Sequence, residues 1–274
     1  MEISVLEIKK SIDFFLGENE CVSRRQGVWL ENRLKFFIFK NLHKAHFADY
    51  SKKWHTVSKR KAFVKLYHAH SKMVLVFKNK AQSFLSAYTT NTLDRPRNAF
   101  VDIHGKIVAV FDQIAHSPEE VSVILEASAV DKLLTHLKKY LDLSQTTVEK
   151  EDTKVYFDLE KGTAPILSKE SLSASATEEE FTLFRLKNFV PLQGIDYQDE
   201  LLLNVFGDDT VSYTKGCYLG QEIIARVHYR SKPPKKLSVR YEEDCLPDQK
   251  SRLTSKTKDP SNGKILGFIF EENT

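Results

Sequence analysis

The sequence predicts an α+β fold. Three observations support this class: a short apolar run at 73–77 precedes a helix-like segment at 80–91, two β-rich runs within 99–114 flank a turn, and a leucine-striped helix follows at 128–141. Strands and helices in this mixed order are typical of α+β proteins.

The hairpin and the long helix each carry local signals. His104-Gly105 separates the two apolar runs, and glycine adopts the positive φ that a tight turn requires. Ser128 is placed to cap the helix, and Asp131 falls in its first turn. One apolar stripe at helical spacing is formed by Leu133, Leu134, Leu137 and Leu141.

The rest of the chain divides into predicted regions. Residues 1–60 are basic and aromatic, and 61–231 hold the elements above together with a strand at 155–159. The small, polar and acidic stretch at 168–180 predicts an exposed connection. Beyond Pro233-Pro234, two strands predict a short C-terminal β unit within 232–274.

Composition predicts a soluble, cytoplasmic protein. The chain has 274 residues and a net charge of +4, so charge alone does not indicate a nucleic-acid partner. Its three cysteines, Cys21, Cys217 and Cys245, are far apart and show no disulfide framework or metal-binding spacing. No secretory signal pattern and no apolar run long enough for a membrane span is visible, and we expect no resident metal.

The most informative stretch is 213–230, YTKGCYLGQEIIARVHYR. Glycines on both sides of Cys217 predict a constrained turn. If Lys215, Arg226 and His228 converge on the thiol, they lower its pKa and make it a nucleophile, a redox thiol or a metal ligand. A small, inert cysteine is the alternative, and a helical i,i+4 ion pair explains Glu222 and Arg226 equally well.

The string KGCYLGQE resembles the signature K-G-C-Y-x-G-Q-E of the YgfZ-type folate-binding proteins, relatives of the glycine-cleavage aminomethyltransferase (GcvT). Three upstream segments look like other elements of that family: SFLSAYTTNTL, DIHGKIVAVF and FRLKNFVP. The resemblance implies a multi-domain aminomethyltransferase-like fold around a central cavity, with 61–231 as the folate-binding core and a truncated β unit after it.

The resemblance also implies the site. Cys217 is the expected functional thiol, and the residues expected to bind tetrahydrofolate or a derivative are Thr90, Asn91, Arg185, Lys187, Lys215, Gly216, Tyr218, Gly220, Gln221, Glu222 and Arg226. Lys187 stands where related aminomethyltransferases carry a Glu that contacts the pterin ring. Because an ammonium cannot accept hydrogen bonds from pterin N–H groups, weak or altered folate binding is expected.

Aminomethyl transfer itself is not expected. Related transferases place an acidic pair, patterned G-G-x-x-D-D, where this chain has Ala109 and Val110. Neither side chain can exchange a proton, so general acid–base assistance is lost at this position.

The resemblance implies an accessory factor in iron–sulfur protein assembly or maintenance, with an indirect effect on tRNA modification. Its expected partners are folate and iron–sulfur client or assembly proteins, with no membrane; direct nucleic-acid binding is not expected from the resemblance but stays open as an alternative. Two alternatives stay open: a thiol-dependent enzyme that uses Cys217, and an RNA- or protein-binding module that depends on residues 1–60.

Overall fold

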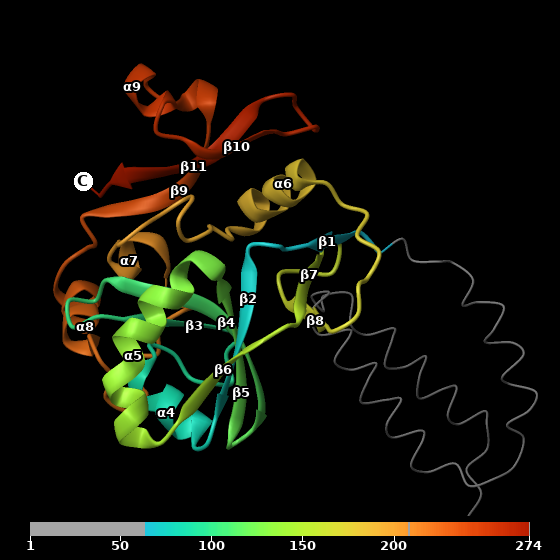
Figure 1. The fold of residues 1–274 in the computed structure, drawn as a ribbon. Helices are drawn as coiled ribbons and strands as arrows, with labels where there is room; N and C mark the ends of the chain where they lie inside the picture. Colours follow the sequence, from blue (N-terminus) through green and yellow to red (C-terminus); the bar gives the residue numbers. More distant parts are fainter. Residues whose placement is uncertain (1–63, 208, 274) are drawn as a thin grey trace, which may run out of the picture. The chain divides into compact units, whose positions relative to one another are not determined.

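The computed structural model describes residues 64–207 and 209–273 (Figure 1). Within it, Phe63–Thr274 form one compact unit that combines helices with three antiparallel sheets. This mixture agrees with the predicted α+β class. The predicted N-terminal region, 1–60, and Cys21 lie outside the described residues.

A five-stranded antiparallel sheet forms the centre of the unit, in the order β3-β4-β5-β2-β6. Its strands are β2 (Lys72–Lys78), β3 (Arg97–Val101), β4 (Ile107–Ser117), β5 (Glu120–Glu126) and β6 (Thr147–Glu151). The predicted hairpin is confirmed as β3 and β4, and Gly105 in its turn has φ of 72°.

Two helices cover one face of this sheet, α4 (Ala81–Tyr88) and α5 (Val130–Ser144) (Figure 1). Leu75 and Phe77 of β2 pack there with Leu133 and Leu137, so the predicted leucine stripe is confirmed. The predicted cap is wrong: Ser128 lies in a 3-10 turn, η1 (Ala127–Ala129), and α5 begins after it without a side-chain cap.

The opposite face of the sheet is covered in part by a small sheet and a helix. The small sheet has the order β1 (Leu66–His68), β7 (Lys154–Asp158) and β8 (Pro165–Ser168), and the helix is α6 (Glu178–Asn188). Val74 and Ile124 of the large sheet pack against Phe157 and Phe181. The connection predicted at 168–180 is shorter than expected, because Thr177 and Glu180 form a capping box that starts α6.

The C-terminal part adds a third sheet, with the order β10 (Thr254–Lys258), β11 (Ile265–Glu272) and β9 (Lys235–Tyr241). The two predicted strands are β9 and β11. The short helices here are α7 (Leu202–Val205), η2 (Glu242–Asp244) and α9 (Pro247–Lys250), and the longer α8 spans Gln221–Arg230. Leu237 and Phe268 pack with Val101 and Tyr218, so this sheet shares a core with the rest of the unit.

Candidate functional site

The loop that carries Cys217 is fixed to a segment about half the chain away. Thr90 Oγ1 donates to the Thr210 carbonyl at 2.7 Å, and Asn91 Nδ2 donates to the Asp209 carbonyl at 2.8 Å. The Ser212 amide donates to the Thr90 carbonyl at 2.9 Å. Two of the segments that the sequence analysis assigned to one site therefore do lie together, and the Thr90-Asn91 side chains hold the loop in place.

Lys215, on the Cys217 loop, also binds the segment that contains Thr90 and Asn91. Its ammonium donates to the carbonyls of Thr89 and Asn91, at 2.7 Å and 2.9 Å, and lies 5.3 Å from the centre of the Tyr218 ring. The group is half-buried, and this burial lowers the pKa of Lys215 to about 8. Lys215 thus acts as a clamp between the two segments.

Gly220 sets the far end of the loop, where α8 begins. Its φ is 79°, and a Cβ at this position would lie 2.3 Å from the Asp102 carbonyl oxygen. A Cβ on Gly105 would in turn touch Ile223 and Ile224 of α8 at 3.4 Å. Only glycine allows this close approach, so the β3–β4 turn packs directly on the start of α8.

Cys217 itself is exposed on this anchored loop. Within 64–207 and 209–273, no residue forms a hydrogen bond with its sulfur. Each of the three cations weighed in the sequence contacts another group: Lys215 donates to carbonyls, Arg226 pairs with Glu222 at 2.8 Å, and His228 stacks on Tyr213 at 3.9 Å. The sulfur is therefore presented to solvent rather than engaged inside the protein.

Arg185 and Lys187 lie away from the Cys217 loop, on α6 where it meets the C-terminal sheet. Arg185 is buried and pairs with Asp196 at 2.8 Å, and half-exposed Lys187 pairs with Asp259 at 3.2 Å. Of the other predicted site residues, Tyr218 is buried in the core and Gly216 is exposed. Glu222 and Arg226 form the predicted i,i+4 ion pair on α8, which starts at half-buried Gln221.

The clamp gives a prediction for pH dependence. In the folded state Lys215 loses its proton near pH 8, whereas an unfolded chain keeps it to pH 10.5, the ordinary value for lysine. Between these values the unfolded state binds more protons, so this residue makes stability rise with pH. We expect the difference in free energy of unfolding between wild type and Lys215→Met to grow from pH 8 to pH 10.

The measurement is urea unfolding at pH 7, 8, 9 and 10 for both proteins. Taking the difference removes the titration of distant groups, which the two proteins share. A difference that stays flat across this range would show that the Lys215 ammonium is solvated rather than clamped.

The sequence analysis missed a buried cluster of charges on the face of the sheet opposite α4 and α5. Lys72 Nζ lies 2.8 Å from Glu126 Oε1, and Arg97 Nε lies 3.8 Å from Asp112 Oδ1. They line a cavity of about 20 Å³ together with Tyr197. One available signal was the hairpin register, which places Arg97 directly opposite Asp112, a cross-strand pair of opposite charge.

Asp112 is one of two carboxyl groups that line this cavity, with Glu126. Burial raises its pKa above the usual range for Asp, although Lys72 and Arg97 oppose that shift. Asp112 lies on β4 just after Ala109 and Val110, so the strand that lacks the expected acidic pair does carry one carboxyl group. Arg97 also lies 3.9 Å from Asp209, which connects the cluster to the start of the Cys217 loop.

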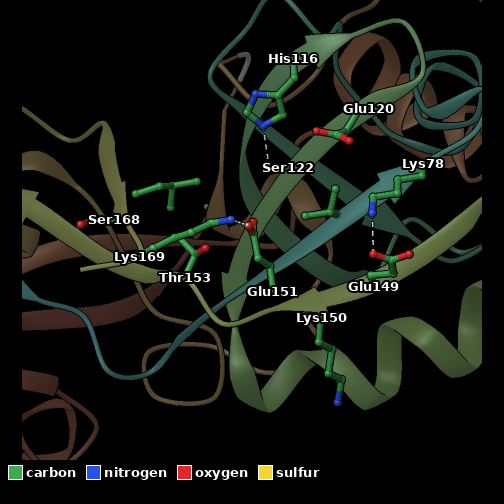
Figure 2. Close-up of a pocket in the computed structure, with 12 residues that line it drawn as sticks. Lys78, His116, Glu120, Ser122, Glu149, Lys150, Glu151, Thr153, Ser168 and Lys169 are labelled. Atoms are coloured by element: carbon green, nitrogen blue, oxygen red, sulfur yellow. Dashed lines mark hydrogen bonds and ion pairs between the residues drawn. The ribbon is translucent and has the colours of Figure 1, made fainter. Parts of the chain in front are cut away.

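A larger groove of about 420 Å³ lies at the other end of the same face (Figure 2). Four of its charged side chains form two ion pairs: Lys78 pairs with Glu149 at 2.6 Å, and Lys169 with Glu151 at 3.3 Å. His116 Nε2 shares a hydrogen bond with Ser122 Oγ at 2.8 Å. Glu120 and Lys150 also line the groove, and Lys150 lies 3.9 Å from Asp131 outside it. Within 64–207 and 209–273 no cluster of side chains is able to bind a metal ion.

Comparison with known proteins supports the fold. No family model matches the chain. The fold is similar to the crystal structure of the glycine cleavage system aminomethyltransferase T from Bartonella henselae, with a TM-score of 0.52 and 10% sequence identity, over 74% of this chain and 77% of that one. At this identity the likeness shows a GcvT-like fold alone. In the described part of the chain, no helix is long and apolar enough to cross a membrane.

Proposed function

We propose that this protein uses a GcvT-like fold as the scaffold of an accessory factor for iron–sulfur proteins, of the YgfZ type, in the reducing cytoplasm. Cys217 is its working group, and any effect on tRNA modification is indirect, through iron–sulfur enzymes. The observation that carries the proposal is an exposed thiol that accepts or donates no hydrogen bond within the described part of the chain, on a loop fixed from both sides.

The chemistry of the thiol fits this role. A thiolate is a soft ligand suited to iron–sulfur clusters, and it also exchanges with disulfides. Both reactions require a sulfur that another molecule can reach. The Lys215 clamp and the Gly220 contact hold the loop on the outside of the protein, so the sulfur reaches a client without prior unfolding.

Aminomethyl transfer is not part of the proposal. Ala109 is fully buried, and neither Ala109 nor Val110 has an ionisable side chain that could exchange a proton. Asp112, the carboxyl group nearest along the strand, faces Arg97 in a cavity with room for about one water molecule. A general acid needs contact with its substrate, and this geometry provides none.

The folate that the fold family implies does not fit the small cavity as it stands. Its volume is about 20 Å³, whereas ligand pockets are usually about 300–1,000 Å³. Charged side chains that line the cavity pair with each other, as Lys72 does with Glu126. Lys187, which stands where the relatives contact the pterin ring, instead pairs with Asp259, near the C-terminal sheet.

Folate binding is therefore expected to be weak. Calorimetry with tetrahydrofolate should give a Kd well above the low-micromolar range, because binding has to break the Lys72–Glu126 pair as well as open the cavity. Lys187→Ala should leave that Kd unchanged. Low-micromolar binding by the wild-type chain would contradict the closed cavity.

A thiol enzyme is the less supported alternative. Such an enzyme needs a base within hydrogen-bond distance of the nucleophile. No residue within 64–207 and 209–273 fills that place at Cys217, since His228 stacks on Tyr213.

The RNA- or protein-binding alternative rests on residues 1–60, which lie outside the described residues.

The proposed function is tested by rescue of a strain that lacks its own YgfZ-type protein, comparing wild type with Cys217→Ser.

A further inference from the structure

We propose that the exposed side of α8 next to Cys217 is a docking surface for a protein that presents carboxylates around the group that reacts with the Cys217 thiol, such as a disulfide sulfur. This rests on the proposed function, because it names the chemistry of the partner that Cys217 meets. We define the α8 surface as the following exposed residues on and beside α8, together with one exposed residue of the turn that packs on its start: Cys217, Arg226, Tyr229, Arg230, Lys232 and Ile103.

Large side chains are exposed on this surface. Tyr229 is 69% exposed and Ile103, in the β3–β4 turn that packs on the start of α8, is 62% exposed. Tyr229 is held by ring contacts, with its centroid 4.6 Å from that of His228 and 5.7 Å from that of Tyr213. A preorganised tyrosine costs little side-chain entropy on binding, and Tyr and Arg are common hot-spot residues in protein interfaces.

The segment 217–232, which contributes most of this surface, has an excess of positive charge. Between 217 and 232 the chain has one carboxylate, Glu222, against the three cations Arg226, Arg230 and Lys232. Glu222 is already taken by Arg226 at 2.8 Å, and within 64–207 and 209–273 neither Arg230 nor Lys232 has a carboxylate partner. Unpaired cations attract a surface of opposite charge and raise the rate of encounter.

The aromatic contacts favour a protein over single-stranded RNA. Bases bind RNA-binding proteins by stacking on open ring faces. Here Tyr213 and His228 stack on each other at 3.9 Å with an interplanar angle of 25°, so these two faces are occupied. The geometry suits side-chain packing against Tyr229 rather than a run of stacked bases.

The docking surface is tested by the rate at which the Cys217 sulfur exchanges with disulfides in peptides of opposite charge. The probes are two ten-residue peptides, one rich in Glu and one rich in Lys, each with a single Cys held in a mixed disulfide with 5-thio-2-nitrobenzoate. The Cys217 thiolate attacks the peptide sulfur, a Cys217–peptide disulfide forms, and the coloured 5-thio-2-nitrobenzoate thiolate leaves. The full chain carries Cys21→Ser and Cys245→Ser, so that only Cys217 reacts.

We expect the acidic peptide to react about tenfold faster than the basic one at low salt, with the ratio falling toward one at high salt. Arg230→Glu with Lys232→Glu should remove or reverse this preference. The matched control is Lys138→Glu with Lys250→Glu, which makes the same charge change at exposed positions on α5 and α9 and should keep the preference.

Equal rates for the two peptides at low salt would overturn the docking surface while leaving the thiol proposal intact. A Cys217 that reacts with neither peptide would instead remove the proposed function. Binding of a ten-residue oligouridylate at 150 mM salt, lost in the Arg230→Glu, Lys232→Glu variant and without any acidic-peptide preference, would replace the protein partner by RNA.

Discussion

Replacing Asp196 by Ala is expected to lower the free energy of unfolding by about 3–5 kcal/mol, the usual cost of removing one partner of a buried ion pair. The Asp196 side chain is fully buried and pairs with Arg185 at 2.8 Å. It also accepts hydrogen bonds from the Leu192 amide at 2.8 Å and from the hydroxyls of Thr254 and Ser255 at 2.8 Å and 2.5 Å. The substitution therefore leaves a buried guanidinium without its counter-charge.

The control is Lys187→Ala, two residues from Arg185 on the same helix. The Lys187–Asp259 pair spans 3.2 Å, but the lysine side chain is 49% exposed, so its loss should cost no more than about 1 kcal/mol. Urea unfolding of the three proteins gives both values. Equal small losses for the two variants would show that Asp196 does not hold α6 to the C-terminal sheet.

The partners of Arg185 in the structure argue against its predicted role in folate binding. The family resemblance assigned Arg185 and Lys187 to ligand binding. In the structure the donors of Arg185 are used by Asp196, by Ser255 at 2.8 Å and by the Val190 carbonyl. These contacts tie three segments of the chain together through the two terminal nitrogens of the guanidinium. The third nitrogen, Nε, is buried without a hydrogen-bond partner among the described residues, so it is not exposed to a folate either.

The elements that the sequence predicted well are those with strong local signals. The Leu133–Leu141 stripe indicated α5, and Gly105 indicated the hairpin turn, because helical periodicity and positive φ leave marks in a short stretch of chain. The start of α5 was predicted wrongly at Ser128, since a 3-10 turn precedes it. Helix ends depend on neighbouring segments as well as on the capping residue.

The contacts that define the site are long-range, and a single sequence does not contain them. The signature predicted a constrained turn at Cys217, but it did not show that Lys215 is held by the carbonyls of Thr89 and Asn91. For the same reason, the expected cations around the thiol were found in contact with other groups. The sequence also did not predict the Lys72–Glu126 and Arg97–Asp112 ion pairs. Each pair joins two strands, and in the sequence alone these four residues look like ordinary polar residues.

Cys217→Ser is expected to abolish function while barely changing stability. The thiol is exposed and makes no hydrogen bond within the described residues, so its loss removes no folded-state contact. A surface substitution of this kind usually changes the free energy of unfolding by less than about 0.5 kcal/mol. Serine keeps the approximate size of the side chain but is neither a soft ligand nor a thiol, so metal binding and disulfide exchange are both lost.

The matched control is the double variant Cys21→Ser, Cys245→Ser. Cys245 is buried and its Sγ lies 3.3 Å from the Tyr241 carbonyl oxygen, so this variant carries the greater risk to folding and the lesser risk to function. Thermal melting of each purified variant separates loss of fold from loss of function.

The most direct test is rescue of a strain that lacks its own YgfZ-type protein, read out as the activity of an iron–sulfur enzyme in that strain. The account predicts rescue by the wild-type chain and by the Cys21→Ser, Cys245→Ser variant, and no rescue by Cys217→Ser at equal protein level and equal melting temperature. Full rescue by Cys217→Ser would contradict the account, because the exposed thiol would then have no part in the function.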